Sequence, residues 1–424
     1  MKTAMFCPHL CAHARALKAK PSIAHAYFEI QGQKEGLDAT YTTYDRIEGN
    51  IVLKVMEETK IDQIRITFEA LTKYQGSSVT TVRRTVPFVP GRRGASHTFL
   101  RFRQPTDSSE YANSTYLVPG KVYKFPFAFT IPARLKYCKH DTQHDDVNDT
   151  HSLLPPTLGR ATSNLLDLND SEMTTNACKI TYALKAYISQ CQSSTDTSPS
   201  ILCDISKTIR VIPATVLDVC RAENPKKHII PKNMRSERTQ GRLQLRAEQP
   251  EPVQIASYKT QNDDIATTTI KLQVQYDPEK NEQPPRLINL RSSLEVATHY
   301  ATVPWEDYPS AQDLNTCDRN QEARVVTVPL SSLDLSSIKW EKIPSLSNAL
   351  PETDESGVSK PCSYLAYVTV PVVMPSDKHF VPTFHSCLIS RTYAVGISLN
   401  YRSSSAFCSS NVKLTTSLEV GYGC

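Results

Sequence analysis

The sequence lacks any apolar stretch near the roughly 18 residues that are needed to cross a bilayer. The one short apolar run close to the start is interrupted by Cys7, Pro8 and His9, which excludes an ordinary secretory signal. We therefore expect a cytoplasmic protein with reduced thiols. Because no acidic residue precedes Glu29, a mitochondrial presequence is the alternative.

Catalytic signatures are also missing. The chain contains no phosphate-binding glycine loop, no dinucleotide fingerprint, no paired-histidine zinc motif and no nucleophile elbow. His385 and Cys387 are only two residues apart, a spacing that on an extended chain favours a half-buried strand over a nucleophile–base contact. The sequence predicts a protein that is not an enzyme and that has no cofactor.

Glycine is scarce and proline abundant, with 13 and 28 residues respectively. Proline lacks the donor that helices and central strands require, so this balance favours many short strands with rigid connections. The net charge is only +5, from 48 basic and 43 acidic residues, which is too mild and too evenly spread for a dedicated nucleic-acid-binding protein. No nucleic-acid partner is expected.

Apolar and polar residues alternate with a period of two through both halves of the chain, which is typical of strands with one buried and one wet face. Helical periodicity is confined to a short stretch over 12–20. Polar loops are expected over 138–178, 190–200 and 341–361. The apolar positions of the alternating strands are Ile64, Ile66 and Phe68; Tyr123 to Ile131; Ile180 to Ile188; Ile270 to Tyr276; Val395 to Tyr401; and Val412 to Val420. Such faces predict antiparallel β-sandwiches.

A weak internal repeat divides the chain into two similar halves. In each half a strand ends at proline, an extended Pro-Thr segment follows, and a strand led by tyrosine comes next. The two copies of the last two features are Pro155-Pro156-Thr157 with Tyr182, and Val381-Pro382-Thr383 with Tyr393. Either two copies of one sandwich domain or chance would produce this pattern.

Six strings along the chain form a recognisable series. They are Ile47-Glu48-Gly49-Asn50-Ile51-Val52-Leu53, Leu117-Val118-Pro119-Gly120, Phe125 to Pro132, Leu154 to Gly159, Gly241 to Leu245 with Glu248-Gln249-Pro250, and Phe380 to Tyr393. Together they resemble the arrestin family, specifically the fungal α-arrestin-like proteins, occur in the order expected of that family and cover most of residues 40–424. The last of these strings is the most specific.

The resemblance implies two immunoglobulin-like, arrestin-type antiparallel β-sandwich domains in tandem. We expect an N-terminal extension over 1–22, sandwiches over 23–215 and 241–424, and a basic linker over 216–240. It also implies an adaptor that binds membrane transporters or receptors and connects them to ubiquitin-dependent endocytosis. Peripheral recruitment to the plasma membrane or endosomes would follow.

The family typically recruits a HECT-type ubiquitin ligase through Pro-Pro-x-Tyr motifs. Neither proline pair here is followed by such a tyrosine: Pro155-Pro156 precedes Thr-Leu, and Pro284-Pro285 precedes Arg-Leu. A ligase would therefore be bound directly by other means or through another adaptor. The alternative function is a structural subunit of an endosomal sorting or vesicle-coat complex.

One stretch is rich in arginine and contains no acidic residue. Guanidinium groups bind phosphates bidentately, so this stretch could meet a phosphorylated cargo tail or anionic lipid. A solvated hairpin is the equally weighted alternative. The candidate residues are Arg83, Arg84, Arg92, Arg93, Arg101 and Arg103. A second basic cluster on the linker, from Lys226 to Arg242, favours a linker role.

Two groups of histidines resemble metal ligands only superficially. The alternation of Cys7, His9, Cys11 and His13 does not match the paired spacing of structural zinc sites. His140, His144 and His151 lie among aspartates, where a polar loop is the preferred interpretation. No metal site is predicted, and an enzyme that depends on His140 or His144 remains a rival hypothesis.

Overall fold

The computed structural model places most strand-forming parts of the chain. The residues that it describes are 23–33, 40–76, 93–105, 115–136, 145–159, 178–190, 200–214, 241–255, 266–278, 282–309, 321–344, 362–403 and 408–422. The predicted N-terminal extension, the short helix over 12–20 and the whole of the predicted linker lie outside these residues. The domain boundaries stay a prediction.

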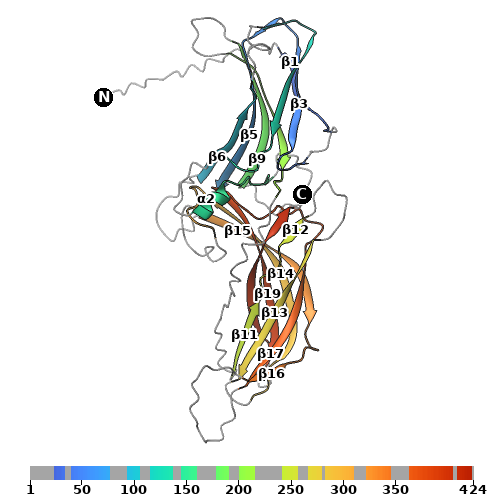
Figure 1. Cartoon of the computed structure of the whole chain (residues 1–424), viewed down its shortest axis with the longest axis vertical. Helices are drawn as coiled ribbons and strands as arrows, with labels where there is room; N and C mark the ends of the chain where they lie inside the picture. Colours follow the sequence, from blue (N-terminus) through green and yellow to red (C-terminus); the bar gives the residue numbers. More distant parts are fainter. Residues whose placement is uncertain are drawn as a thin grey trace, which may run out of the picture.

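The first β-sandwich is drawn at the top of Figure 1. Its two main sheets have the strand orders β1-β3-β8 and β2-β10-β9-β5-β6, and a small sheet pairs β4 with β7. Its strands are β1 (Ile23–Ile30), β2 (Thr40–Tyr41), β3 (Arg46–Val55), β4 (Thr59–Ile61), β5 (Gln63–Gly76), β6 (Arg93–Arg103), β7 (Thr115–Leu117), β8 (Val122–Thr130), β9 (Cys178–Gln190) and β10 (Ser200–Val211).

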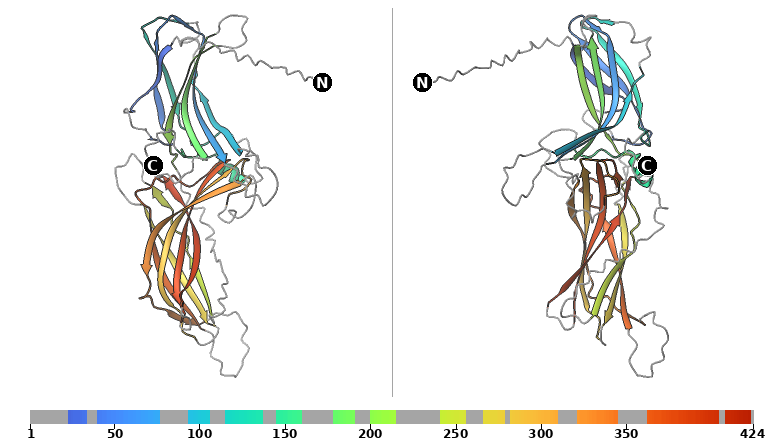
Figure 2. Two further views of the ribbon diagram at one scale, coloured as in Figure 1. Left: turned by 180° about the vertical axis from the view of Figure 1, so that it is seen from behind. Right: turned by 90° about the vertical axis from the view of Figure 1, so that its left-hand side faces the viewer.

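The second β-sandwich lies below the first, and Figure 2 shows the two stacked end to end in both views. One sheet has the order β11-β13-β17-β16, the other has the order β15-β14-β19-β18 with β20 also on β19, and β12 pairs with β21. The strands are β11 (Gly241–Ala247), β12 (Val253–Ile255), β13 (Thr267–Pro278), β14 (Arg286–Ala301), β15 (Gln321–Asp334), β16 (Glu341–Pro344), β17 (Cys362–Val373), β18 (Phe384–His385), β19 (Ile389–Arg402), β20 (Ser410–Leu418) and β21 (Val420–Tyr422). The predicted all-β fold with two sandwiches is confirmed.

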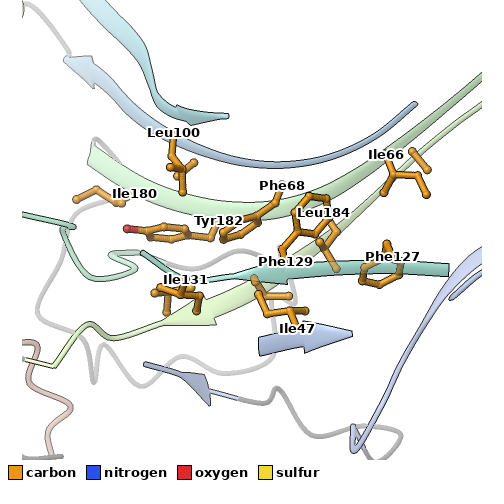
Figure 3. Packing of buried hydrophobic residues seen from close by; sticks show 14 of the residues in the cluster. Ile47, Ile66, Phe68, Leu100, Phe127, Phe129, Ile131, Ile180, Tyr182 and Leu184 are labelled. Atoms are coloured by element: carbon orange, nitrogen blue, oxygen red, sulfur yellow. The ribbon is translucent and has the colours of Figure 1, made fainter. Parts of the chain in front are cut away.

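The alternating side chains fill the core of each sandwich. In the first domain Phe68 of β5 stacks on Tyr182 of β9, with ring centroids 6.1 Å apart. Phe129 of the facing sheet lies against the other side of Phe68, at 5.9 Å. Figure 3 shows these rings between Ile47 and Leu100, so that both sheets contribute to one apolar layer. Interlocking of this kind accounts for the two-residue period of the sequence.

A buried tyrosine fixes an extended segment across the end of the first sandwich. Tyr182 is fully buried, and its hydroxyl donates to the carbonyl of Pro155 at 2.5 Å. Two residues later, the amide of Thr157 donates to the carbonyl of Val211 at 2.7 Å. The Thr157 hydroxyl accepts from the amide of Val211 at 2.8 Å. The Pro-Thr segment therefore binds the last residue of β10.

The second sandwich repeats this arrangement atom for atom. The Tyr393 hydroxyl donates to the carbonyl of Val381 at 2.6 Å. The amide of Thr383 donates to the carbonyl of Val420 at 2.7 Å, and its hydroxyl accepts from the amide of Val420 at 3.0 Å. In both domains the strand held in this way also pairs in parallel with a short early strand, β2 or β12. The geometry supports duplication of one domain over a chance repeat.

Strands β5 and β14 carry the clearest repeat within the two domains. Ala70 lies opposite Tyr182, and Val296 lies opposite Tyr393, which fixes the correspondence of the two strands. Under this alignment residues 65–74, Arg-Ile-Thr-Phe-Glu-Ala-Leu-Thr-Lys-Tyr, match residues 291–300, Arg-Ser-Ser-Leu-Glu-Val-Ala-Thr-His-Tyr. The arginine, the glutamate, the second threonine and the tyrosine are identical.

The two final tyrosines of this repeat meet at the junction of the domains. The rings of Tyr74 and Tyr300 are 4.6 Å apart between centroids. Apolar residues of the second domain join the core of the first, among them Phe384, Leu388 and Ile389. Apolar side chains thus join the two domains, while the second sandwich keeps a core cluster of its own.

A short helix at the junction differs from the sequence-based expectation. The expected polar loop over 138–178 contains α2 (Asp145–His151), which Figure 1 places beside β15. The Thr150 hydroxyl lies 2.6 Å from the Tyr308 hydroxyl, so α2 is hydrogen-bonded to the second domain. Seven residues are too few for helical periodicity to be visible in a sequence. Similarly, the expected loop over 341–361 begins as strand β16, which pairs with β17.

The loop predicted over 190–200 falls between β9, which ends at Gln190, and β10, which begins at Ser200, and residues 191–199 lie outside the described residues. Among the residues that the structure describes, no helix is long and apolar enough to cross a membrane.

Replacing either buried tyrosine by phenylalanine tests the hydrogen bond from its hydroxyl to the extended proline-containing segment. We expect Tyr182→Phe and Tyr393→Phe each to lower the free energy of unfolding by about 1 to 3 kcal/mol, because a buried carbonyl loses its donor. Urea denaturation measures the change. Tyr367→Phe, at an exposed position of β17, is the matched control and should have little effect.

The junction should weaken in alkali. Burial and the nearby Glu322 carboxylate raise the pKa of Tyr74, and the same two causes raise the pKa of Tyr300 to about 12. Since the folded-state pKa values exceed the ordinary value of 10.0, both tyrosines contribute stability that is complete below pH 10 and is lost as the pH rises further.

Unfolding free energies at pH 8 and pH 11 measure this loss. A Tyr74→Phe, Tyr300→Phe double variant should show a smaller decrease than the native chain. An equal decrease in both proteins would contradict the assignment.

Candidate functional site: a basic sheet face

The outer face of the five-stranded sheet in the first domain collects basic side chains. On β5 the core residues Ile66 and Phe68 alternate with Arg65, Thr67 and Glu69, which point away from the core, although Thr67 is covered by its neighbours and is itself buried. This alternation places the polar members of β5 in the middle of the sheet surface, between β9 and β6.

The neighbouring strands add bases to both sides of β5. Arg103 of β6 and Lys185 of β9 both lie opposite Thr67. Two strand spacings separate them, about 10 Å between backbones. One row along, Arg101 lies opposite Glu69. We call this set, Arg65, Arg101, Arg103 and Lys185 around Glu69, the basic face.

Glu69 is held by two of these bases. Arg101 Nε lies 2.9 Å from one carboxylate oxygen, and Lys185 Nζ lies 2.7 Å from the other. The Glu69 side chain is only 13% exposed. Its partial burial would raise the pKa of the carboxyl group, but the hydrogen bond and charge of Lys185 and the charge of Arg101 outweigh it, and the pKa is lowered. Glu69 is therefore an anion that orients two cations.

The other bases have capacity for a ligand. Arg103 is exposed and makes no ion pair with any residue that the structure describes. Arg65 is exposed above the ring of Tyr187, with 5.7 Å from the guanidinium carbon to the ring centroid. Farther along the sheet Lys73 and Lys179 lie opposite one another and extend the positive surface toward the domain junction. An anionic group would find several donors here.

Only part of the predicted arginine patch can be placed. Arg83, Arg84 and Arg92 lie outside the described residues, and Arg93 is the first residue of β6. Arg101 and Arg103 occupy the same outer face. The sequence stretch contains no acid, but the fold brings Glu69 to Arg101 from a neighbouring strand.

Sequence reasoning missed Arg65 and Lys185, because they are distant in sequence and join β6 only by strand pairing. Their outward positions in alternating strands were the available signal.

The remaining candidates form no second site in what the structure describes. His140, His144 and the Cys7 to His13 group lie outside that part of the chain. His151 is buried at the end of α2, and His385 Nδ1 contacts the hydroxyl of Ser390. Cys387 is buried rather than half-buried as predicted. Among the described residues no three potential ligands lie close enough to hold a metal ion.

The fold and the basic face define a class of protein: a tandem pair of β-sandwiches with a charged outer sheet surface on the first. A comparison with curated proteins finds no match. The family model described as the arrestin (or S-antigen) N-terminal domain matches residues 30–213. The match covers the first sandwich and supports an arrestin-family protein and, with it, an adaptor role in general.

Removing the central acid tests the electrostatic arrangement. Because the pKa of Glu69 is lowered in the fold, its ionised form stabilises the protein above the ordinary value of 4.5, and this contribution is lost as the pH falls through the folded-state pKa. We expect Glu69→Gln to lower the unfolding free energy at pH 7 by up to about 1 kcal/mol. Chemical denaturation at pH 7 and pH 3 should show that the difference shrinks at the lower pH.

Proposed function

We propose that this protein is an α-arrestin-like adaptor that binds membrane transporters or receptors and links them to ubiquitin-ligase-dependent endocytosis. The arrestin N-terminal domain match and the tandem sandwiches support the adaptor role. The cytoplasm, with recruitment to the plasma membrane or endosomes, is the proposed location.

The basic face is the proposed binding surface for anionic groups on the cargo. The observation that carries this part is the position of Arg103 and Lys185, which flank Thr67 on neighbouring strands. Lys185 already shares Glu69 with Arg101, so one ligand phosphate would meet Arg103 directly and compete with Glu69 for Lys185. Phosphorylation of a cargo tail would thereby increase its affinity.

A binding experiment with defined peptides tests this surface. We expect a doubly phosphorylated, otherwise neutral peptide to bind at least about tenfold more tightly than the unphosphorylated peptide, and to weaken as salt is raised. Arg103→Ala with Lys185→Ala should remove most of that preference. Arg402→Ala, an exposed arginine of the second domain, is the matched control.

Fluorescence anisotropy measures these affinities, and vesicles that contain phosphatidylserine form a parallel arm. Binding to vesicles without any preference for the phosphopeptide would assign the basic face to lipid. Equal affinity for all probes in the double variant and the native chain would refute the proposed surface.

The ligase connection is a separate question. Purification of the protein from cells under mild conditions should recover a HECT-type ligase, directly or with a second adaptor. A stable, stoichiometric set of coat or sorting proteins without a ligase would instead favour a structural subunit.

A further inference from the structure

The duplicated strands β5 and β14 carry the same glutamate in different surroundings. Glu295 is the counterpart of Glu69 in the alignment fixed by the buried tyrosines. Both point outward from the middle strand of a sheet, since Leu294 and Val296 on either side of Glu295 are fully buried. Both are partly buried. The acid is thus retained in both domains.

The cations that hold this acid in the first domain are missing in the second. Arg101 lies opposite Glu69, whereas Thr327 lies opposite Glu295. Lys185 lies opposite Thr67, and Gly396 lies opposite the corresponding Ser293. Glu295 makes no ion pair or hydrogen bond with any residue in the described ranges. In the second domain a threonine and a glycine thus occupy the two positions that hold basic residues in the first domain, and Glu295 keeps neither internal partner.

The surroundings of Glu295 are shaped by these small residues. A Cβ atom at Gly396 would lie 2.7 Å from Oε1 of Glu295, so the carboxylate occupies space that any other residue would fill. The next strand, β20, contributes Thr415 and Ser417 opposite Gly396 and Ala394. The cross-strand row that contains Glu295 runs from Thr327 through Glu295 and Ala394 to Ser417. In this row the Glu295 carboxylate is the only ionisable group.

We propose that Glu295 is the binding site for an arginine side chain of a partner protein. A partly buried carboxylate has lost some of its hydration and is stabilised by a cation that satisfies both oxygens. In the first domain two internal bases do this, one on each oxygen. A guanidinium group supplies two parallel donors at once and therefore replaces both.

The neighbouring side chains explain why the partner must come from outside. The Glu295 carboxylate lies over Gly396, and neither Gly396 nor Thr327 offers a charge that would pair with it. Arg291 and His299, the nearest basic residues on the same strand, are each four residues away, about 13 Å along the backbone. This site has the opposite charge preference to the basic face, so the protein would hold an anionic and a basic segment on different domains.

Nuclear magnetic resonance titration of the full chain tests the site. The probes are the peptide acetyl-Gly-Ser-Arg-Ser-Gly-amide and the same peptide with citrulline, which keeps the shape but removes the charge. We expect saturable shifts of the Gly396 amide signal with the arginine peptide and none with citrulline. Glu295→Gln should weaken binding at least about tenfold. Equal shifts with both peptides, or unchanged binding in Glu295→Gln, would overturn the proposal.

Two further variants separate a binding role from a structural one. Gly396→Ala should displace the carboxylate and weaken arginine binding while the fold is kept. In the reverse design, Arg101→Thr with Lys185→Gly, Glu69 should gain an arginine site like that of Glu295. If this variant stays folded and gains no site, the comparison between the domains fails. Phosphopeptide binding to the basic face is measured separately, so the two proposals succeed or fail independently.

Discussion

The buried tyrosine hydroxyl in each sandwich is the interaction on which the rest of the structure depends. Tyr182 and Tyr393 each donate to a carbonyl in an extended proline-containing segment, and that segment then hydrogen-bonds to a terminal strand of its own domain. One side chain thereby connects the middle of a sheet to the end of the sandwich. The same connection sets the correspondence between the domains, from which the comparison of Glu69 with Glu295 follows.

Duplication also explains how the domains meet. The repeated strands β5 and β14 end in Tyr74 and Tyr300, and these two rings pack on each other where the sandwiches join. Equivalent ends of two related domains therefore face one another, as equivalent surfaces do in a symmetric dimer. Phe384 and Ile389 extend the contact into the first core. A junction of this kind holds the two outer faces in a fixed relation.

The fold could be predicted from the sequence because apolar and polar residues alternate along β5, β8, β9, β13, β19 and β20, as buried and exposed positions do in the structure. It also contained the Pro-Thr and tyrosine repeat, although only the hydrogen bonds show that the copies are equivalent. Helix α2 was missed because seven residues cannot display a helical period. Of the candidate basic face, the sequence could indicate Arg101 and Arg103, which share a strand, but not Lys185 and Glu69, which lie beside them only because of the strand register.

Register also explains why the two domains could acquire different surfaces on one scaffold. Inward positions such as Phe68 and Leu294 are constrained by packing, and a change there costs several kcal/mol. Outward positions in the same strands are free of that constraint, and substitutions there are usually within about 0.5 kcal/mol. The counterparts of Lys185 and Arg101 in the second domain are Gly396 and Thr327, so the charge of the outer face differs between two sandwiches of the same fold. The glutamate is common to both domains. In the first domain its neighbours are two bases of the same chain, and in the second domain, where these bases are absent, the glutamate is available to a base of another molecule.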